Sequence, residues 1–346
     1  MGLPEIFIAF QTAAVSAITR SARGRVALVV KDDTAEGAAQ ESFTALSDVP
    51  KSHYTAGTYR LLSLTFAAAP SRVVVLRAGE DSTEVFARLK QLDFDWLAAP
   101  ALENAEVVSF IQSQRGAGRS VKAVVANAAS PDCEGIVNLC VKDLILSDGT
   151  VEPAVYTGRI AGLLAALPLT RSATYAELPE VVGCAAVEDP DGDIDAGRLI
   201  VVPGGSGYRL GRAVTSLVTL TTDRGAPFQK IKIVEGTDLI RRDIAAAFES
   251  GYIGKVLNDY DSKLLLVTAV NSYLSSLEGD VLDPTADNAC AISLSGQRRW
   301  LQSRGVDVSA MKDAAVLRAN TGSEVFLQAE LTFCDAMEDL TLTISM

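Results

Sequence analysis

The chain has 346 residues, 48% of them hydrophobic, and its 31 basic and 43 acidic residues give a formal net charge of -12. This length allows two or three domains with a large buried core, and the composition is that of a globular protein rather than a disordered or fibrous one. The negative charge argues against a general binder of nucleic acid or of anionic membranes, because both require a positive field.

The N-terminus and the cysteines predict a protein of the cytosol. The N-terminus has no charged region followed by an apolar core, and no apolar run approaches the roughly 20 residues that span a bilayer. We therefore expect no export and no membrane insertion. The five cysteines are an odd number without a CxxC motif, which predicts buried free thiols in a reducing compartment rather than a metal site.

Taken in chain order, the first half alternates short apolar runs with amphipathic segments. We expect strands at residues 25–30, 72–77, 94–98 and 121–126, and helices at residues 54–69, 82–91 and 103–116. Strands and helices in alternation predict an α/β sheet with parallel strand pairs. A further helix at 154–167 carries Gly158 and Gly162, so we expect it to pack closely against a neighbouring element.

The second half mixes further strands with longer helices. Two apolar segments, 199–202 and 213–220, are predicted to form a hairpin around the glycine-rich loop 203–208, and a strand is predicted at 229–235. Helices are expected at 238–251 and 261–277 and towards the end of 288–304. From about residue 246 onward, the sequence therefore predicts a compact α+β domain.

Both ends of the chain alternate apolar with other residues, as strands do. The C-terminal residues on the apolar side are Val325, Leu327, Ala329, Leu331 and Phe333, followed after a turn-like stretch by Leu340, Leu342 and Ile344. This pattern predicts a terminal hairpin, and Ile6, Ile8 and Phe10 predict a short N-terminal strand. No Lys or Pro interrupts the last strand, so two alternatives stay open: both ends pair within one subunit, or they add to neighbouring copies.

No catalytic, cofactor or metal site is predicted. The single histidine, His53, lies in a polar stretch without a nucleophile beside it. Gly205, Gly207 and Gly211 miss the dinucleotide spacing by one residue and fit a hairpin turn, and the acidic stretch 188–197 lacks the glycine and glutamate of a calcium loop. One basic cluster, Arg298, Arg299 and Arg304, is either a solvated face or a docking surface for an acidic partner.

Several stretches resemble the tail sheath proteins of contractile phages and phage-tail-like bacteriocins, in the short form found in Gram-positive bacteria. The similar stretches are Val155–Glu180, Gly251–Lys255, Asn258–Lys263, Asn320–Ser323 and Ala336–Leu340, together with Gly2–Ile6 and Arg20–Gly24 at the start. They are long, they occur in the family's order and they cover nearly the whole chain.

The resemblance implies a non-enzymatic subunit that forms stacked hexameric rings around a tail tube and contracts to drive the tube through a cell envelope. It implies four regions: an N-terminal linking arm at 1–22, an outer α/β region at 23–245 with an internal boundary left open near 95–150, an inner tube-facing domain at 246–334, and a C-terminal linking arm at 335–346. Its partners would be other copies, the tube, the baseplate and the tail terminator. The particle would be a phage or bacteriocin tail assembled in the host cytoplasm.

On this basis we expect the two arms to exchange between subunits. Ile6, Ile8 and Phe10 of one copy and Leu340, Leu342 and Ile344 of another would add to the sheet that contains Val325–Phe333 of a third. The basic cluster would face the tube. The alternatives are an α/β enzyme with its site at the strand ends, although no base, metal set or phosphate loop supports it, and a tube protein, which the helices argue against.

Overall fold

The computed structural model describes residues 17–205 and 207–346, and Ile6, Ile8 and Phe10 lie outside the described residues. The chain divides into two compact units. The large unit consists of Ser21–Arg242 and Asp335–Met346, and the small unit consists of Asp243–Cys334 together with residues 17–20.

A nine-stranded mixed sheet forms the centre of the large unit, in the order β2-β3-β1-β4-β5-β6-β11-β12-β9. The six strands from β3 to β11 are parallel, while β2, β12 and β9 add in antiparallel orientation at the edges. The strands are β1 (Arg25–Val30), β2 (Gln40–Phe43), β3 (Arg72–Arg77), β4 (Trp96–Ala98), β5 (Lys122–Ala126), β6 (Ile136–Cys140), β9 (Glu177–Leu178), β11 (Arg198–Pro203) and β12 (Tyr208–Leu210). A small separate sheet is made of β10 (Val181–Gly183), β7 (Ile145–Leu146) and β8 (Gly149–Thr150).

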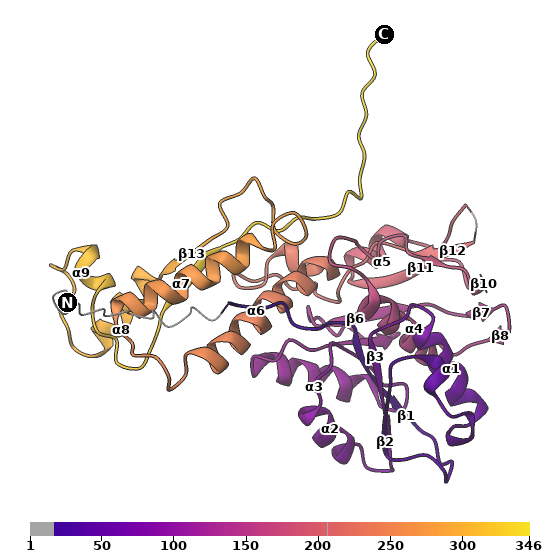
Figure 1. The fold of residues 1–346 in the computed structure, drawn as a ribbon. Helices are drawn as coiled ribbons and strands as arrows, with labels where there is room; N and C mark the ends of the chain where they lie inside the picture. Colours follow the sequence, from indigo (N-terminus) through magenta and orange to yellow (C-terminus); the bar gives the residue numbers. More distant parts are fainter. Residues whose placement is uncertain (1–16, 206) are drawn as a thin grey trace, which may run out of the picture. The chain divides into compact units, whose positions relative to one another are not determined.

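Helices cover both faces of the large sheet, as Figure 1 shows. The helices are α1 (Ala56–Phe66), α2 (Ser82–Gln91), α3 (Asn104–Gly116), α4 (Pro153–Ala166) and the short α5 (Pro190–Asp195), with 3-10 turns η1 (Leu46–Asp48), η2 (Lys51–His53) and η3 (Ala226–Gln229). Val26 and Leu28 of β1 join the core beneath α1 and α4, whereas Ala27 and Val29 join the core beneath α2 and α3. Because the strands are buried on both faces, they read as continuous apolar runs, and the α/β prediction is confirmed.

The predicted close packing of α4 is confirmed at its two glycines. A Cβ atom at Gly162 would lie 2.0 Å from the carbonyl oxygen of Thr65 in α1, and one at Gly158 would lie 2.6 Å from the Thr65 hydroxyl. Both distances are well below any van der Waals contact. The two helices therefore approach at positions where only glycine fits.

The small unit combines helices with a two-stranded sheet. Helix α6 (Ile231–Gly251) begins in the large unit and ends in the small one, and it is followed by α7 (Tyr260–Ser275), α8 (Leu294–Ser303) and α9 (Asp313–Leu317). Strand β13 (Ala289–Ile292) pairs in antiparallel orientation with β14 (Leu327–Glu330), and α7 packs on β13. No helix within the described residues is long and apolar enough to cross a membrane.

Two predicted strands of the large unit are wrong. The hairpin partner of β11 is β12 rather than 213–220, whose backbone instead bonds to loops, for example from Ser216 N–H to the Ile136 carbonyl at 2.8 Å. The predicted strand at 229–235 is also helical, because η3 ends at Gln229 and α6 begins at Ile231. Glu235, Asp238 and Arg242 recur there at helical spacing and contact the large sheet, and these contacts override the strand preference of the isoleucines.

The predicted terminal hairpin is also wrong. Strand β14 pairs with β13, which lies some forty positions earlier in the chain, and residues 334–346 form no strand with it. A single antiparallel bridge joins Phe333 to Leu282 before the chain leaves the small unit. The turn-like residues 335–339 therefore do not return the chain onto β14.

Candidate assembly interface

The small sheet has an open edge at β14. The Ser293 N–H donates to the Phe326 carbonyl at 2.8 Å, and the register pairs Ile292 with Leu327 and Cys290 with Ala329. Hydrogen-bonded pairs alternate with non-bonded pairs in an antiparallel ladder, so the N–H and C=O groups of Leu327 and Ala329 point away from β13. Within the described residues no other strand covers this edge. Such a row of free groups can accept a further strand.

The sheet is held in place by two of the stretches on which the family resemblance rests. The Asn258 amide donates to the carbonyls of Gly322 and Glu324 at 2.8 and 2.9 Å, just before β14. The buried Lys263 ammonium donates to the Thr321 hydroxyl at 2.9 Å and to the Gln297 side chain at 3.0 Å. The stretches 258–263 and 320–323 thus meet in space and set the position at which β14 begins.

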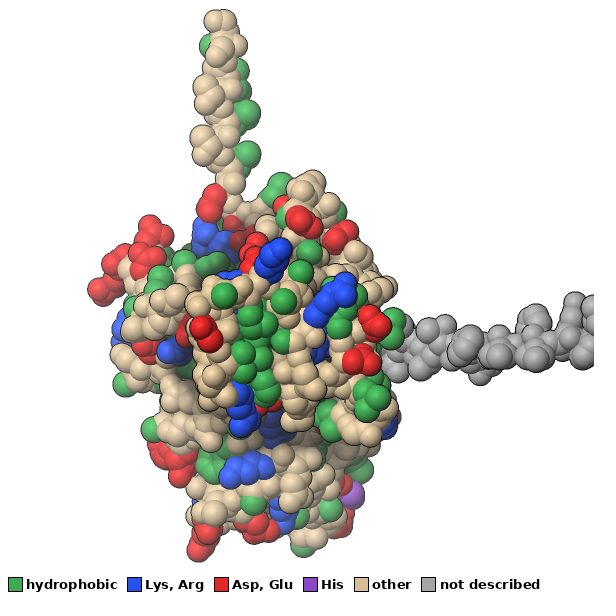
Figure 2. Space-filling view, turned by 90° about the vertical axis from the view of Figure 1, so that its left-hand side faces the viewer, with side chains coloured by type: hydrophobic (Ala, Val, Ile, Leu, Met, Phe, Trp, Pro, Cys, Tyr) green, Lys and Arg blue, Asp and Glu red, His purple; other side chains and the backbone are tan. Residues whose placement is uncertain are grey.

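The C-terminal tail, Leu340–Met346, exposes its apolar side chains. Leu340, Leu342 and Ile344 are 89%, 72% and 75% exposed. Figure 2 shows hydrophobic side chains exposed along the tail. An exposed apolar alternation of this kind makes the tail a candidate interaction surface.

The residues just before the tail are attached to the large unit by charged contacts. The Glu338 carboxylate is only 7% exposed; it accepts hydrogen bonds from the hydroxyls of Ser172 at 2.9 Å and Thr174 at 2.6 Å, and it lies 3.4 Å from the Arg212 guanidinium. Arg212 also pairs with Asp339 at 2.6 Å, and Lys230 pairs with Asp335. The hydrogen bond between Arg212 and Asp339 raises the pKa of Arg212 and lowers the pKa of Asp339. We call residues 335–339 with these partners the tail anchor.

A second exposed apolar surface lies in the small unit. A groove of about 610 Å³ is lined by the stacked rings of Phe248 and Tyr252, by the loop after α6 and by Val325. Ile253 and Leu257 in this loop are 57% and 81% exposed. A hydrophobic hollow is visible on the face shown in Figure 2. Apolar surface of this kind is typical of sites that another chain covers.

The three arginines of the predicted basic cluster differ in their surroundings. Arg298 on α8 pairs with Asp313 at 2.5 Å, and the Arg304 guanidinium lies 5.2 Å from the centre of the Trp300 ring. Arg299 is exposed. The cluster therefore keeps a positive charge at the surface, although Arg298 has an acidic partner within the chain.

A pocket of about 520 Å³ opens at the ends of β5 and β6, lined by Asn127, Cys140 and Lys142 among others, whereas the ends of β1 and β4 are filled by structural contacts. Asp32 follows β1 there, and its carboxylate accepts hydrogen bonds from the N–H and hydroxyl of Thr55 at 2.9 Å. The cavity beside the neighbouring strand ends, lined by Ala99 and Asn104, holds only about 20 Å³, far below the volume of a ligand site. Among the described residues no group of His, Cys, Asp or Glu could hold a metal ion, and the cysteines are free thiols.

His53 and the remaining motifs also have structural roles. The His53 ring bonds to Glu41 at 2.7 Å, and the glycine-rich loop joins the antiparallel strands β11 and β12, as predicted for a hairpin turn. The acidic stretch forms α5, which Asp189 caps.

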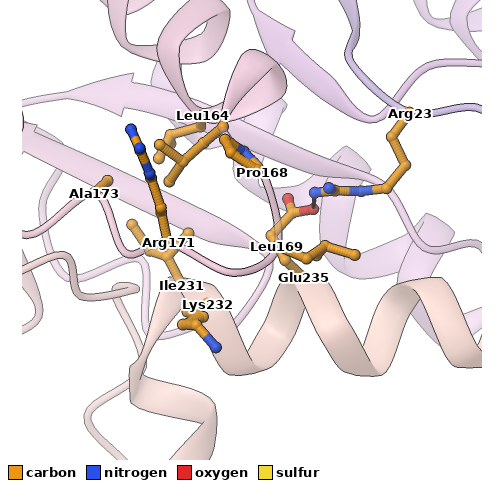
Figure 3. A pocket seen from close by; sticks show the side chains of 10 residues that line it. Arg23, Leu164, Pro168, Leu169, Arg171, Ala173, Ile231, Lys232 and Glu235 are labelled. Atoms are coloured by element: carbon orange, nitrogen blue, oxygen red, sulfur yellow. Dashed lines mark hydrogen bonds and ion pairs between the residues drawn. The ribbon is translucent and has the colours of Figure 1, made fainter. Parts of the chain in front are cut away.

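A cavity between α4 and α6 holds about 20 Å³ and is lined by Arg23, Arg171 and Glu235 (Figure 3). It leaves no room for a ligand.

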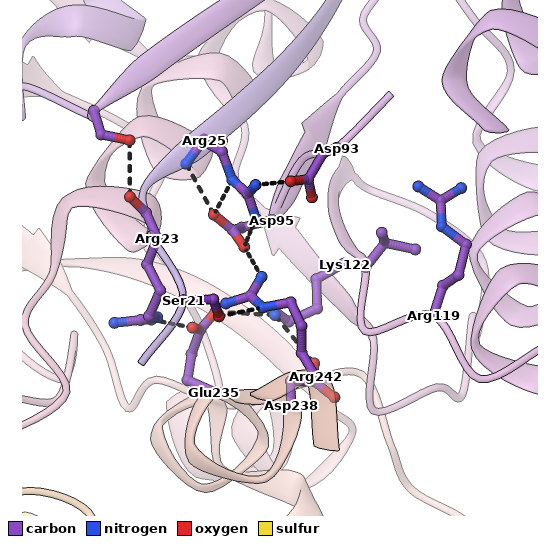
Figure 4. Close-up of polar contacts among 12 residues, drawn as sticks. Ser21, Arg23, Arg25, Asp93, Asp95, Arg119, Lys122, Glu235, Asp238 and Arg242 are labelled. Carbon is purple, nitrogen blue, oxygen red and sulfur yellow. Dashed lines mark hydrogen bonds and ion pairs between the residues drawn. The ribbon is translucent and has the colours of Figure 1, made fainter. Parts of the chain in front are cut away.

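A buried charge network joins α6 to the end of the large sheet at which the central strands β1, β4 and β5 begin (Figure 4). Asp238 on α6 pairs with Lys122 at 3.0 Å and with Arg115 at 2.8 Å, and Asp95 pairs with Arg25 at 3.1 Å and with Arg242. Burial opposes the ionisation of both carboxylates, but their cationic partners outweigh it and hold the pKa of Asp95 and of Asp238 below the usual range. The charged groups at this end of the sheet therefore pair with one another within the large unit.

Sequence reasoning missed the tail anchor and the charge network. Arg212 and Glu338 are separated by more than a hundred positions, and no local pattern in the sequence links them. The only available signal was the similarity of Ala336–Leu340 to the family's C-terminal stretch.

Comparisons with known proteins found relatives from a phage and from a phage-like element. The chain is 33% identical to the tail sheath protein of Clostridium phage phiCD119 over 362 aligned positions, which cover 100% of this chain and 99% of the relative. It is 27% identical to the phage-like element PBSX protein XkdK of Bacillus subtilis over 63% of this chain, an alignment that spans half of that longer protein. No protein-family model matches the chain.

Two solved structures of sheath proteins have the same fold. The sheath of the anti-feeding prophage in its contracted state superposes with a TM-score of 0.71 over 100% of this chain and 99% of the other, at 12% identity. A sheath tail protein of Listeria innocua superposes with a TM-score of 0.67 over 93% of this chain and 97% of the other, at 17% identity.

Proposed function

Because the chain belongs to the family of contractile tail sheath proteins, we propose that its copies polymerise as stacked hexameric rings around a tail tube. The protein is a structural sheath subunit of a contractile system and not an enzyme. Contraction of the stack would drive the tube through the envelope of a target cell. The partners would be other copies, the tube, the baseplate and the tail terminator, in a phage or bacteriocin particle assembled in the host cytoplasm.

In this proposal the terminal arms link the subunits. Ile6, Ile8 and Phe10 of one copy and the tail of another add to the sheet of Val325–Phe333 in a third. The observation that carries the proposal is the combination of an exposed, alternating apolar tail with a small sheet whose β14 edge is open. Among the described residues neither the tail nor the β14 edge has a strand partner, and strand addition would provide one.

A linked stack can rearrange while the arms stay bound. Main-chain hydrogen bonds hold the arms on the neighbouring subunits. The compact parts of each subunit can then turn as rigid bodies between the packing of the extended stack and that of the contracted stack. Contacts that repeat without closing build helical stacks. The region 23–245 would form the outer part, the domain 246–334 would face the tube, and the extended stack would be held by a kinetic barrier until the baseplate releases it.

The arm proposal is tested by a single charge on either face of the tail. Leu342→Asp places a carboxylate on the apolar face, whereas Thr343→Asp places the same charge on the polar face as a matched control. Negative-stain microscopy should show striated cylinders for the wild type and Thr343→Asp and dispersed particles for Leu342→Asp. Cylinders of normal length from Leu342→Asp, or from a chain lacking residues 1–12, would contradict strand exchange.

We also propose that Arg298, Arg299 and Arg304 face an acidic tube surface in the extended sheath. The exposed charge of Arg299 supports this role, and such contacts act mainly on orientation and association rate. Arg299→Glu should weaken assembly on the tube and reduce its salt sensitivity, while Arg88→Glu on α2 serves as the control. Unchanged assembly and salt dependence in Arg299→Glu would remove the support.

A further inference from the structure

We infer that the tail anchor positions the tail for assembly: Glu338, bound to the hydroxyls of Ser172 and Thr174, fixes the point from which the tail leaves its own subunit. This role rests on the strand exchange proposed above. It concerns how the tail is presented to a neighbouring copy, and it assigns a function in assembly to residues of the large unit that lie outside both arms.

The two hydroxyls that bind Glu338 are oriented by the large unit itself. The Thr174 hydroxyl accepts a hydrogen bond from the Ala213 N–H at 2.9 Å, and the Ser172 hydroxyl accepts one from the Thr174 N–H at 3.1 Å. A hydroxyl that accepts from a backbone N–H keeps its single proton to donate elsewhere. Ala173 and Ala213 beside these hydroxyls are buried in the hydrophobic core, which ties the hydroxyl pair to the large unit.

Glu338 is the residue of the tail anchor that is held most firmly. One carboxylate oxygen accepts from both hydroxyls, at 2.6 and 2.9 Å, and the other lies 3.4 Å from the Arg212 guanidinium. The Glu338 side chain is 7% exposed, whereas those of Asp335 and Asp339 are 34% and 77% exposed. Salt and water screen exposed ion pairs much more than buried ones. Glu338 is therefore the main contact that keeps the anchor closed.

Anchoring at Glu338 sets the length of the free tail. The seven residues Leu340–Met346 span at most about 24 Å when fully extended, whereas the twelve residues from Asp335 onward would span about 41 Å. The volume that the apolar residues can sample grows roughly two- to fivefold when the anchor opens, the lower value for a coiled chain and the upper for an extended one. A closed anchor therefore presents the tail at a higher local concentration to a neighbouring copy within its reach.

The critical concentration for assembly tests this role. Glu338→Ala should raise the critical concentration of the full-length chain about two- to fivefold, measured by sedimentation over a dilution series at equal concentrations of folded subunit. Glu84→Ala removes an exposed carboxylate from α2 and changes the net charge equally, so it should behave as the wild type. An unchanged critical concentration in Glu338→Ala would overturn the inference and leave strand exchange in place.

A truncated chain separates this role from the function on which it rests. A chain that ends at Asp339 keeps Glu338 but lacks the tail, and under strand exchange it should form no cylinders at any concentration. Glu338→Ala should instead recover striated cylinders as its concentration rises. Failure to recover them would show that Glu338 supplies a contact rather than a position, which also overturns the inference. Cylinders from the truncated chain would remove strand exchange itself.

A second experiment opens the anchor from the large unit and leaves the tail unchanged. Glu-C protease cleaves after accessible glutamates, so it reports on Glu338 in the isolated full-length subunit. Release of the peptide 339–346, followed by mass spectrometry, should be several-fold faster for Arg212→Ala than for the wild type. Arg198→Ala, which breaks an exposed ion pair on β11, should leave the rate unchanged.

The critical concentration of Arg212→Ala should rise in the same direction as that of Glu338→Ala. Faster cleavage without such a rise would show that the anchor opens but does not influence assembly, and the inference would be wrong. Wild-type cleavage after Glu338 as fast as in a synthetic peptide of residues 333–346 would show that the anchor is open in solution, with the same consequence.

Discussion

Strand β1 and the C-terminal tail are both built from apolar residues in extended conformation, yet their environments are opposite. Val26 and Leu28 of β1 are fully buried, whereas Leu340 of the tail is 89% exposed. The difference is that β1 has β3 and β4 as neighbours from its own chain, while the tail has no such neighbour among the described residues. An apolar strand is stable where both neighbours are supplied, and under the proposed strand exchange the tail would gain its neighbours in the assembly.

Charged residues repeat the same contrast. In the large unit Asp95 and Asp238 are buried and pair with cationic side chains of the same chain. In the tail anchor Glu338 is also buried, but Asp339 beside it remains 77% exposed next to Arg212. The large unit is therefore expected to determine the stability of the isolated subunit, and the tail is expected to determine assembly.

The largest expected effect on subunit stability comes from breaking the buried network. Asp238→Leu leaves Lys122 and Arg115 buried without this carboxylate, and the free energy of unfolding should fall by about 3–5 kcal/mol. Urea denaturation of the purified subunit measures the change. Glu84→Ala, which removes an exposed partner of Arg88, should cost less than about 1 kcal/mol. Equal losses from both variants would contradict the assignment of stability to the buried network.

The contact between α1 and α4 gives the next largest effect. Gly162→Ala places a methyl group against the Thr65 carbonyl and should destabilise the subunit by about 1–3 kcal/mol. Gly57→Ala at the start of α1 meets no atom within 4 Å and should be neutral or slightly stabilising. The same denaturation experiment compares the two. A neutral Gly162→Ala would show that the helices can separate without cost.

Acid should weaken the same network. The folded-state pKa values of Asp95 and Asp238 lie below those of an unfolded chain, so their contribution is fully present above the unfolded pKa of about 4. As the pH falls below that value, the unfolded state binds more protons than the folded state, and stability is lost progressively. Urea midpoints measured between neutral pH and pH 3 should fall, and Asp238→Leu should show a smaller fall. An identical pH profile in the variant would contradict this assignment.

Removing the tail should have the smallest effect on the isolated subunit. A chain that ends at Asp339 loses only exposed side chains, so its free energy of unfolding should change by less than about 0.5 kcal/mol. The same truncation should abolish assembly into cylinders, as judged by sedimentation and microscopy. A large loss of stability would mean that the tail packs on its own subunit, and the contrast with β1 would disappear.

Local patterns predicted most of the large unit because its strands and helices follow their own periodicity. Residues 25–30 and 72–77 were expected as strands and form β1 and β3. Residues 229–235 were misassigned because the isoleucines favour a strand, while the charges that make this segment a helix contact strands more than a hundred positions away. The arginine cluster was found from spacing alone, but its pairing with Asp313 was not.

By itself, the sequence determined the α/β order, the absence of a recognisable catalytic motif and the alternating apolar ends, because each depends on neighbouring residues. Only the tertiary structure decided which strand β14 pairs with and that Glu338 anchors the base of the tail. These contacts join positions far apart in the chain, and their energies depend on burial and geometry that no local pattern encodes.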